Sequence, residues 1–497
     1  MIELLITMFS FFSKSKLSNL LVLALLIALA FLRFFSFQES VEFNSDFGRD
    51  SLFAMRILTE KPTLLGAQAS AGGFYLGPLY FYSIAAVFLL VGFIPQIVSV
   101  VFISLNILAG YFIYQFLTKN VSKAAGFFGL ILFTFNPLLI LSARGATHVP
   151  MMPVITVVSM MALYQSLSKK KAFWHLISGL AFGLFFHVHF TSLLLLPGYF
   201  LAVFLWSGKT WKDKFIALFS HGFGMLLMLT PLILFDLRHG FINFKSFIGY
   251  LISSARGEMI TENLQHWTLS EKITNLAGVF TKTILFQAAL LVLSMIGLKK
   301  SLKDKFLSFS LPNLLSLMFF SMFIFYMFYS GYLYTYYLVI PVTLGILLFA
   351  VGLANYSSLL LGSLLVIAIA LFSLGNIKSI YQPTFRTIAG LSRITHRIET
   401  HIDQTKPSSF TIFKDSSDGL TSLGYEYRFL LQRDGYVPAT ELEYNVAEAM
   451  YVIQEDGTSD PLTLGNWEVV QFNPTTVEEV ADFEIRGKKI KLFVLYR

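Results

Sequence analysis

Long apolar stretches fill the first three quarters of this 497-residue chain and constrain its fold more than any other feature. Between Leu17 and about Leu374 they repeatedly reach the roughly 20 residues that a helix needs to cross the hydrocarbon core of a bilayer. Only 13% of the residues are charged, against about 25% in a soluble protein. The sequence therefore predicts an α-helical protein that crosses a membrane several times.

The short loops between the apolar stretches are either rich in lysine or nearly free of it. Lysines cluster at positions 14–16, 119–123, 169–171, 209–214 and 299–305. Because lysine-rich loops stay in the cytoplasm during insertion, these loops are predicted to be cytoplasmic. The other loops and the C-terminal quarter are predicted to be extracytoplasmic, which places the protein in the cytoplasmic membrane. The same lysines explain the net charge of +8, so nucleic acid is not expected as a partner.

Two absences narrow the chemistry. The chain has no cysteine, which excludes disulfides, thiolate metal sites and cysteine nucleophiles. It also has no recognisable nucleotide-binding motif, so no nucleotide cofactor is expected. The apolar run near the N-terminus lacks a small-residue cleavage site and is expected to remain as the first span.

The pattern predicts about 11 transmembrane helices. They are placed near 17–37, 97–117, 125–142, 150–168, 172–187, 190–206, 215–235, 277–298, 306–329, 333–352 and 357–374. The apolar segment 74–92 is treated differently, because a crossing there would invert every later lysine-rich loop. Gly73, Gly77 and Pro78 also make it a poor straight helix. We expect this segment to lie along the outer leaflet or to dip into it.

The composition changes at Asn376, which divides the chain into a membrane domain, 1–375, and an extracytoplasmic domain, 376–497. The second part mixes charged and apolar residues and contains turn signals, which is typical of a small α/β or α+β domain. Strands are predicted at 410–413, 467–472 and 488–496, and helices at 422–432 and 476–482. Because no catalytic motif is visible in it, the domain is interpreted as a cap or a partner-binding module.

The first outer loop, 38–73, carries the most reactive-looking group of residues. Asp46 and Asp50 are four residues apart and would share one face of a helix. Either carboxylate could act as a general base for a hydroxyl group, and Asp46 could also bind a divalent cation through oxygen. The alternative is structural, with Ser45 or Asp46 only capping a helix.

Other ionisable residues fall at the outer ends of predicted spans. Arg144, His187, His189 and Arg238 are such residues, and ionisable groups at this depth are usually functional. Arginine forks match phosphate oxygens, so Arg144 and Arg238 are expected to approach one another beside a histidine and Asp46. The alternatives are that each arginine extends toward lipid headgroups and that each histidine is a satisfied interior residue.

These motifs together resemble the GT-C superfamily of membrane glycosyltransferases, within the group of protein O-mannosyltransferases and aminoarabinose lipid A transferases. The resemblance covers roughly residues 17–374. It rests on Asp46-Phe47-Gly48-Arg49-Asp50, on segment 73–80, on Arg144, and on segments 187–191, 235–239 and 336–341.

The resemblance implies an inverting hexosyl- or pentosyltransferase that takes a sugar from a polyprenyl-phosphate carrier. The acceptor would be a hydroxyl of a lipid, glycan or protein outside the cytoplasm. Asp46 is implied as the catalytic base or as a ligand of Mg²⁺ or Mn²⁺, and juxtamembrane helices are implied in the first outer loop. Asp50 is the other candidate for the catalytic carboxylate, and Asp50 or His148 could stand in for the second acidic residue of the family. The implied groups for the donor phosphate are Arg144, His187, His189, Arg238 and Tyr337.

One departure from the family and two other functions stay open. The family often has an acidic residue after the arginine of the second outer loop, where this chain has Ala146-Thr147-His148, which argues against a two-carboxylate metal site. A transporter or flippase for a lipid-linked glycan is the main alternative, although transporters carry paired broken helices near the middle of the membrane. A scaffold that presents 376–497 to partners is the other.

Overall fold

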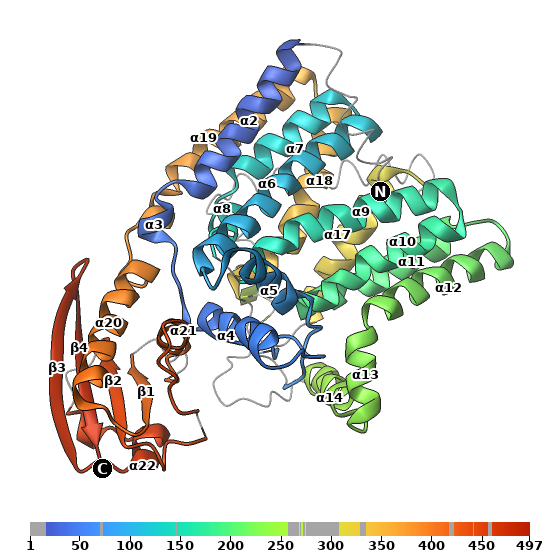
Figure 1. Cartoon of the computed structure of the whole chain (residues 1–497). Coiled ribbons are helices and arrows are strands. Elements are labelled where there is room, and N and C mark those ends of the chain that lie inside the picture. The colour runs from blue at the N-terminus through green and yellow to red at the C-terminus, as the bar shows by residue number, and fades with distance from the viewer. Residues whose placement is uncertain are drawn as a thin grey trace.

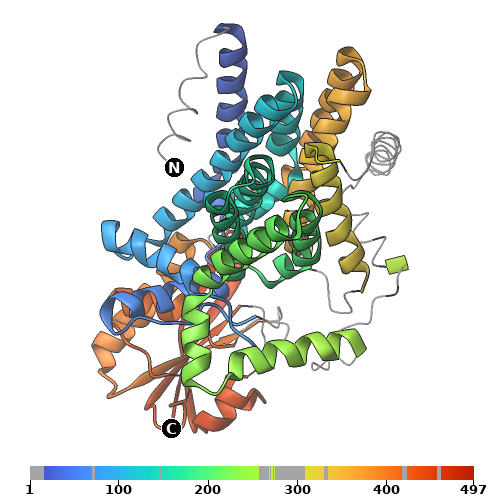
Figure 2. The same ribbon diagram turned by 90° about the vertical axis from the view of Figure 1, so that its right-hand side faces the viewer.

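The computed structural model describes residues 16–69, 73–145, 147–256, 308–328, 334–416, 422–440, 442–455 and 460–497, with four isolated positions between 268 and 274. Its first part is a bundle of apolar helices, and its last part is a small sheet domain. Both views show this domain at one end of the bundle (Figures 1 and 2).

The bundle is a multi-pass membrane domain. Its helices are α2 (Lys16–Phe34), α6 (Pro95–Asn120), α7 (Lys123–Phe135), α8 (Pro137–Ala143), α9 (Met152–Lys169), α10 (Ala172–Gly183), α11 (Leu196–Trp206), α12 (Trp211–Met228), α13 (Thr230–Arg238), α17 (Leu311–Phe328), α18 (Val339–Tyr356) and α19 (Leu359–Gly375). Among the described residues, four helices are long and apolar enough to cross a membrane, or six if each of two bent pairs is one span. The count of about 11 stays a prediction, because the expected span 277–298 lies outside the described residues.

The segment expected not to cross forms α5 (Leu79–Val91). Its 13 residues extend about 20 Å at the rise of an α-helix, which is shorter than the roughly 30 Å hydrocarbon core. Pro78 precedes the helix, and Gly92 ends it with a positive φ of 77°. Because α10 and α11 have only 12 and 11 residues, helix length alone does not decide the matter, and the expectation that this segment does not cross the bilayer stays a prediction.

Two spans are broken at prolines, and a side chain compensates for each break. The α7–α8 pair bends by 63° at Pro137 and the α12–α13 pair by 68° at Pro231. Proline lacks the N–H that would bond the carbonyl four residues earlier. Fully buried Arg33 donates to the carbonyl of Phe133 (3.0 Å), and Thr230 donates to the carbonyl of Leu227 (2.8 Å). These bonds keep the broken helices free of unpaired groups at those positions.

The first outer loop contains the two juxtamembrane helices that were expected, α3 (Phe37–Ser40) and α4 (Ser45–Thr59). Figure 1 shows α4 between the bundle and the sheet domain. Asn44 caps α4, since its side chain accepts a hydrogen bond from the amide of Phe47 (3.0 Å). The predicted cap at Ser45 or Asp46 is therefore wrong, because both of these residues lie inside the helix.

Shorter elements complete the outer face. α14 (Ile242–Arg256) follows the end of α13, and 3₁₀ helices occur at η2 (Val149–Met151), η3 (Leu184–His187), η4 (Phe190–Leu195), η5 (Thr335–Leu338), η6 (Lys378–Tyr381) and η7 (Pro461–Thr463). The turn between η3 and η4 contains His189, and η5 contains Tyr336 and Tyr337. η2, η3, η4 and η5 pack on the helices of the bundle, whereas η7 packs on β3 and β4 of the C-terminal domain.

The C-terminal domain is a four-stranded mixed sheet with strand order β1-β2-β4-β3. The strands are β1 (Phe410–Asp415), β2 (Ala449–Gln454), β3 (Thr476–Ile485) and β4 (Lys488–Tyr496), and the helices are α20 (Ile388–Thr405), α21 (Tyr425–Arg433) and α22 (Trp467–Phe472). β1 and β2 are parallel, while β2–β4 and β3–β4 are antiparallel. A small domain of helices and strands was expected here.

Two of its elements differ from the prediction. Segment 467–472 was predicted to be a strand and forms α22, in which Glu468, Val469 and Phe472 are buried at helical spacing. Segment 476–482 was predicted to be a helix and belongs to β3, which pairs with β4 across a turn at Arg486 and Gly487. Both turn residues have positive φ (52° and 77°), as a tight hairpin requires. Strand β2, buried along its whole length, was not predicted at all.

Candidate functional site

Three charged residues share one face of α4. Asp46, Arg49 and Asp50 are spaced so that they become neighbours on a helix. Arg49 Nη1 lies 3.0 Å from an oxygen of Asp46, and Arg49 Nε and Nη2 lie 2.9 and 2.8 Å from one oxygen of Asp50. The Asp46 side chain is 60% exposed, whereas that of Asp50 is only 1% exposed. Arg49 therefore links an accessible carboxylate to a buried one.

The buried carboxylate has a second partner on α5. Tyr80 donates a hydrogen bond to Asp50, and it is itself almost fully buried. Burial raises the pKa of Asp50 to about 6, although the adjacent Arg49 guanidinium opposes this shift. Asp50 thus holds Arg49 from the buried side of α4, and Asp46 is the carboxylate that faces solvent.

Aromatic and histidine rings from three other outer segments gather beside this face. The His148 ring stacks on His189 at 5.3 Å and meets Tyr80 edge-on at 5.7 Å. The His189 ring lies 5.5 Å from Tyr336 and 4.9 Å from Tyr337. The second outer loop, the η3–η4 turn and η5 thus converge on the residues of α4 and α5.

His148 is the unusual member of this group. Its Nε2 atom is buried and has no hydrogen-bond partner among the described residues. Burial lowers the pKa of His148 to about 4, opposed by the Asp46 charge and reinforced by Arg49, so its ring is neutral at neutral pH. A buried polar atom without a partner is costly in a folded protein. Such an atom beside a charged helix face is what a ligand-binding site would contain.

His187 at the end of η3 and His189 in the η3–η4 turn have different surroundings. His189 belongs to the ring cluster and accepts a hydrogen bond from the amide of Thr191 (3.2 Å). His187 instead joins two helices, because its Nδ1 accepts from the amide of Leu79 (3.3 Å) and its Nε2 donates to the carbonyl of Met228 (2.8 Å). His187 therefore fixes the start of α5 to the end of α12.

The two predicted phosphate-binding arginines also lie in different surroundings. Arg144 donates to the carbonyls of Arg33 (2.8 Å) and Phe35 (2.7 Å), and its guanidinium lies 4.7 Å from the ring centre of Tyr381. Arg238 is exposed at the end of α13. The described contacts give no support to a direct pairing of these arginines.

The donor set on α4 does not fit a divalent cation. No group of three or more histidine, aspartate or glutamate side chains in the described ranges could hold a metal ion. In addition, the guanidinium of Arg49 occupies the place between the two carboxylates. The α4 carboxylates are therefore not interpreted as metal ligands.

Several residues of this site were not assigned a role from sequence. They are Arg49, Tyr80, His148 and Tyr336. Arg49 lies within the acidic motif, and its spacing of three residues from Asp46 is a signal for an ion pair on a helix. His148 stands near the position where a second acidic residue was expected. No local signal predicts Tyr80 and Tyr336, because they reach the site only through the packing of α5 and η5 against it.

Comparisons with known proteins show which fold the chain shares. The model of the dolichyl-phosphate-mannose-protein mannosyltransferase family matches residues 76–235, which is less than half of the chain. ArnT from Cupriavidus metallidurans in the apo state aligns with a TM-score of 0.62 at 12% identity, covering 96% of this chain and 98% of that chain. ArnT bound to undecaprenyl phosphate aligns with a TM-score of 0.57 at 13% identity, covering 95% and 97%.

A third solved structure shares the fold over most of the chain. It is the archaeal oligosaccharyltransferase AglB from Archaeoglobus fulgidus in complex with an inhibitory peptide and a dolichol-phosphate, with a TM-score of 0.50 at 11% identity, covering 89% of this chain and 70% of that chain. No curated protein sequence matches the chain. Identities this low show a common fold rather than a common substrate.

The helical bundle, the juxtamembrane helices and the sheet domain define the class of protein. The chain has the fold of the GT-C membrane glycosyltransferases, and the matched family model agrees. This confirms the resemblance that the sequence motifs indicated.

Proposed function

We propose that this protein transfers a sugar from a polyprenyl-phosphate carrier to an acceptor hydroxyl at the outer face of the cytoplasmic membrane. Two of the structural neighbours were solved with undecaprenyl phosphate or a dolichol-phosphate. The observation that carries the proposal is the charged face of α4, where the exposed Asp46 pairs with Arg49. The pair supplies the two groups that such a transfer needs, a base and a fixed positive charge.

Asp46 is proposed as the general base. Its carboxylate accepts the proton of the acceptor hydroxyl while the hydroxyl oxygen bonds to the anomeric carbon. The bond between that carbon and the phosphate oxygen breaks at the same time, and the polyprenyl phosphate leaves with the electron pair. A single displacement of this kind inverts the configuration at the anomeric carbon, so the enzyme is proposed to be inverting.

Arg49 is proposed to bind the leaving phosphate. A guanidinium presents five donors in a planar fork that matches phosphate oxygens. In the described structure one of its nitrogens is engaged by Asp46 and two by Asp50. A phosphate that competes for the Asp46 side of the fork would release Asp46 to act as the base. Buried Asp50 would keep Arg49 in place during this exchange.

The ring cluster is proposed to form the wall of the sugar site. The partly buried ring of Tyr336 lies near Asp46 of α4 and contacts the buried rings of His189 and Tyr337, and sugars pack their apolar faces on such rings. The unpartnered Nε2 of neutral His148 is available to bond a hydroxyl of the sugar or the acceptor. Arg144 and His187 contribute to the same site by holding the surrounding helices, and exposed Arg238 is proposed to contact the phosphate or a lipid headgroup.

The proposal is tested by donor binding and transfer with a panel of polyprenyl-phosphate sugars. Arg49→Lys is expected to weaken carrier binding and transfer, because a point charge loses the forked geometry. Arg56→Lys is the matched control, since Arg56 lies on the same helix, forms an exposed ion pair with Glu60 (4.0 Å) and lies over the ring of Phe53 (5.9 Å). Equal effects of the two substitutions, or the absence of transfer from every carrier, would contradict the proposal.

A further inference from the structure

A second face of α4 is packed against the C-terminal domain. Gly48 lies against the backbone of α21, where an added Cβ atom would fall 2.4 Å from the amide nitrogen of Glu426 and 2.5 Å from its Cα. Backbone atoms cannot yield as a flexible side chain can, so only glycine allows this approach. The domain therefore touches the backbone of the helix that carries Asp46 and Arg49.

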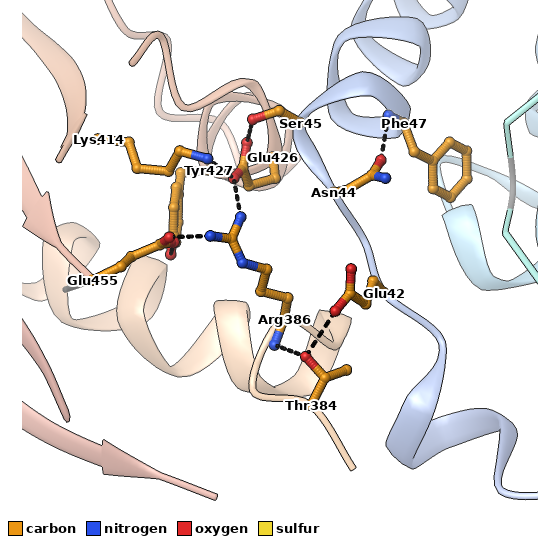
Figure 3. Close-up of polar contacts among 10 residues, drawn as sticks. All are labelled: Glu42, Asn44, Ser45, Phe47, Thr384, Arg386, Lys414, Glu426, Tyr427 and Glu455. Atoms are coloured by element: carbon orange, nitrogen blue, oxygen red, sulfur yellow. Dashed lines mark hydrogen bonds and ion pairs between the residues drawn. The ribbon is translucent and has the colours of Figure 1, made fainter. Parts of the chain in front are cut away.

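Glu426 makes the polar contact of this junction. Ser45, the first residue of α4, donates a hydrogen bond to the Glu426 carboxylate, as Figure 3 shows. Glu426 is buried, and its other oxygen lies 3.2 Å from the ammonium of Lys414 and 3.8 Å from the guanidinium of Arg386. A buried carboxylate with two cations has little freedom to move, because displacing it would leave a charge without a partner.

Arg386 connects Glu426 both to a second buried carboxylate of the C-terminal domain and to the chain segment that precedes α4. Arg386 also pairs with the buried Glu455, and Tyr427 donates to Glu455 at 2.8 Å (Figure 3). The carbonyl of Arg386 accepts from the amide of Phe43 just before α4 (2.7 Å). The chain entering α4 is thus fixed by both main-chain and side-chain bonds to the domain.

An aromatic contact closes the junction on its apolar side. The ring of Phe429 on α21 lies 5.6 Å from Phe43 and stacks on Phe88 of α5 at 5.9 Å. Phe43, Phe88 and Phe429 are all nearly fully buried. The domain is therefore packed on α4 and α5 together, the two helices that supply the Arg49–Asp50–Tyr80 contacts.

The two faces of α4 are coupled by its short first turn. Ser45 immediately precedes Asp46, and Gly48 immediately precedes Arg49. Any shift of the helix against Glu426 would move both charged side chains at the proposed reaction centre. We propose that Glu426, held by Lys414 and Arg386, is a positioning residue that sets the place of Asp46 and Arg49 through Ser45 and Gly48. This inference rests on the proposed function, and it makes the C-terminal domain part of the catalytic unit rather than only a module for partners.

The kinetic test compares two substitutions that remove the same kind of bond. Ser45→Ala removes the hydrogen bond to Glu426, and Ser422→Ala removes the bond from Ser422 to Glu468, which joins two residues of the C-terminal domain and does not involve α4. Misplacing reacting groups by about 1 Å can cost about 100-fold in rate. We expect Ser45→Ala to lower kcat by about tenfold or more when it is assayed well below its thermal unfolding midpoint, and Ser422→Ala to leave kcat close to that of the wild type.

A third variant shows whether the loss acts through the base. If Ser45 works by placing Asp46, then Ser45→Ala should add little to the loss already caused by Asp46→Asn, because the two changes affect one interaction. Fully additive losses would mean that Ser45 acts elsewhere and would overturn the proposal. So would equal losses of kcat in the Ser45→Ala and Ser422→Ala proteins.

A spectroscopic readout separates this inference from the proposed function. The chain has no cysteine, so a spin label reacts only with cysteines that are introduced. Cysteines can be introduced at Thr59 on α4 and at Ser104 on α6, both of which are exposed. The distance distribution between the labels should broaden or shift in Ser45→Ala and Gly48→Ala but not in Ser422→Ala. An unchanged distribution in both α4 variants would overturn the positioning role. A changed distribution in a protein that transfers no sugar would support the positioning of α4 and would reject the proposed function instead.

Discussion

Asp46 and Asp50 lie on the same face of α4, and their different burial gives them different chemistry. The Asp46 side chain is 60% exposed and can exchange a proton with an acceptor. Asp50 is enclosed by Arg49 and Tyr80, and its burial raises its pKa to about 6. At neutral pH Asp50 is therefore charged but close to its point of protonation.

Lowering the pH should weaken transfer through Asp50. As the pH falls through about 6, the buried carboxyl takes up a proton and no longer holds the Arg49 guanidinium by charge. We expect kcat/KM to decline below that pH, which gives the pH profile an acidic limb. We expect Asp50→Asn to have lower activity and no such limb, because an amide does not titrate. A pH profile of transfer by both proteins across this range is the measurement. An acidic limb that persists unchanged in Asp50→Asn would assign it to another group.

Sequence reasoning at this scale was successful where the signal is local. Spacing was sufficient to predict that Asp46 and Asp50 share a helix face. It could not tell which of them is buried, because Tyr80 comes from a different helix. Arg144 illustrates the same limit, since its hydrogen bonds go to carbonyls more than 100 residues earlier in the chain (positions 33 and 35). The two interpretations of Arg144 from sequence did not include this role.

At the scale of elements, the start of α5 depends on one close contact. A Cβ atom at Gly77 would lie 2.1 Å from Nδ1 of His187, and the amide of Gly77 donates to the carbonyl of Phe186 (3.0 Å). The segment that enters α5 is therefore packed directly on the turn after α10. This contact, together with the bonds of His187 to Leu79 and Met228, keeps the short helix beside the bundle.

Gly77→Ala should destabilise the protein by about 1–3 kcal/mol, the usual cost of overpacking a filled site. His187→Ala removes the ring that the new methyl group would strike, although it also removes two hydrogen bonds. We therefore expect the double variant to be more stable than the sum of the two single effects predicts. Thermal unfolding in detergent measures all three proteins. Strict additivity would show that Gly77 and His187 are not in contact.

The sheet domain shows why the presence of a small domain was easier to predict than the type of each of its elements. Segment 476–482 contains Glu and Ala, which favour a helix locally, yet it pairs with β4 along its length. Segment 467–472 is apolar enough for a strand and forms a helix that covers the sheet. Strand β2 lies between β1 and β4 and is buried throughout. Pairing partners far along the chain decide these cases, and a short window of sequence does not contain them.

For the whole molecule, the distribution of lysine gives an arrangement of the chain across the membrane that stays a prediction. The helical membrane domain and the small sheet domain were both expected from apolar length and composition. The tight junction between the sheet domain and α4 was not expected, because it joins residues that are about 380 positions apart, as Ser45 and Glu426 are. Which side of the membrane this junction faces remains a prediction from the loop charges.

Labelling in intact cells tests that prediction. The cysteine-free sequence allows single cysteines to be placed at Val437 in the C-terminal domain and at Lys212 in the lysine-rich loop, both of which are exposed. A thiol reagent that cannot cross the membrane should label Val437→Cys in intact cells and Lys212→Cys only after the membrane is opened. The reverse pattern would place the α4 face in the cytoplasm.

The central claim is that Asp46 is the base for sugar transfer from a lipid-phosphate donor. The most direct measurement is the transfer rate and the carrier affinity of wild-type and Asp46→Asn proteins with the same polyprenyl-phosphate sugar. Removing a general base usually costs about 10²–10⁴-fold in rate, while an amide of the same shape leaves Arg49 free to bind phosphate. We predict a loss of kcat in this range with carrier binding retained. Transfer by Asp46→Asn at the wild-type rate would contradict the assignment of α4 as the catalytic helix.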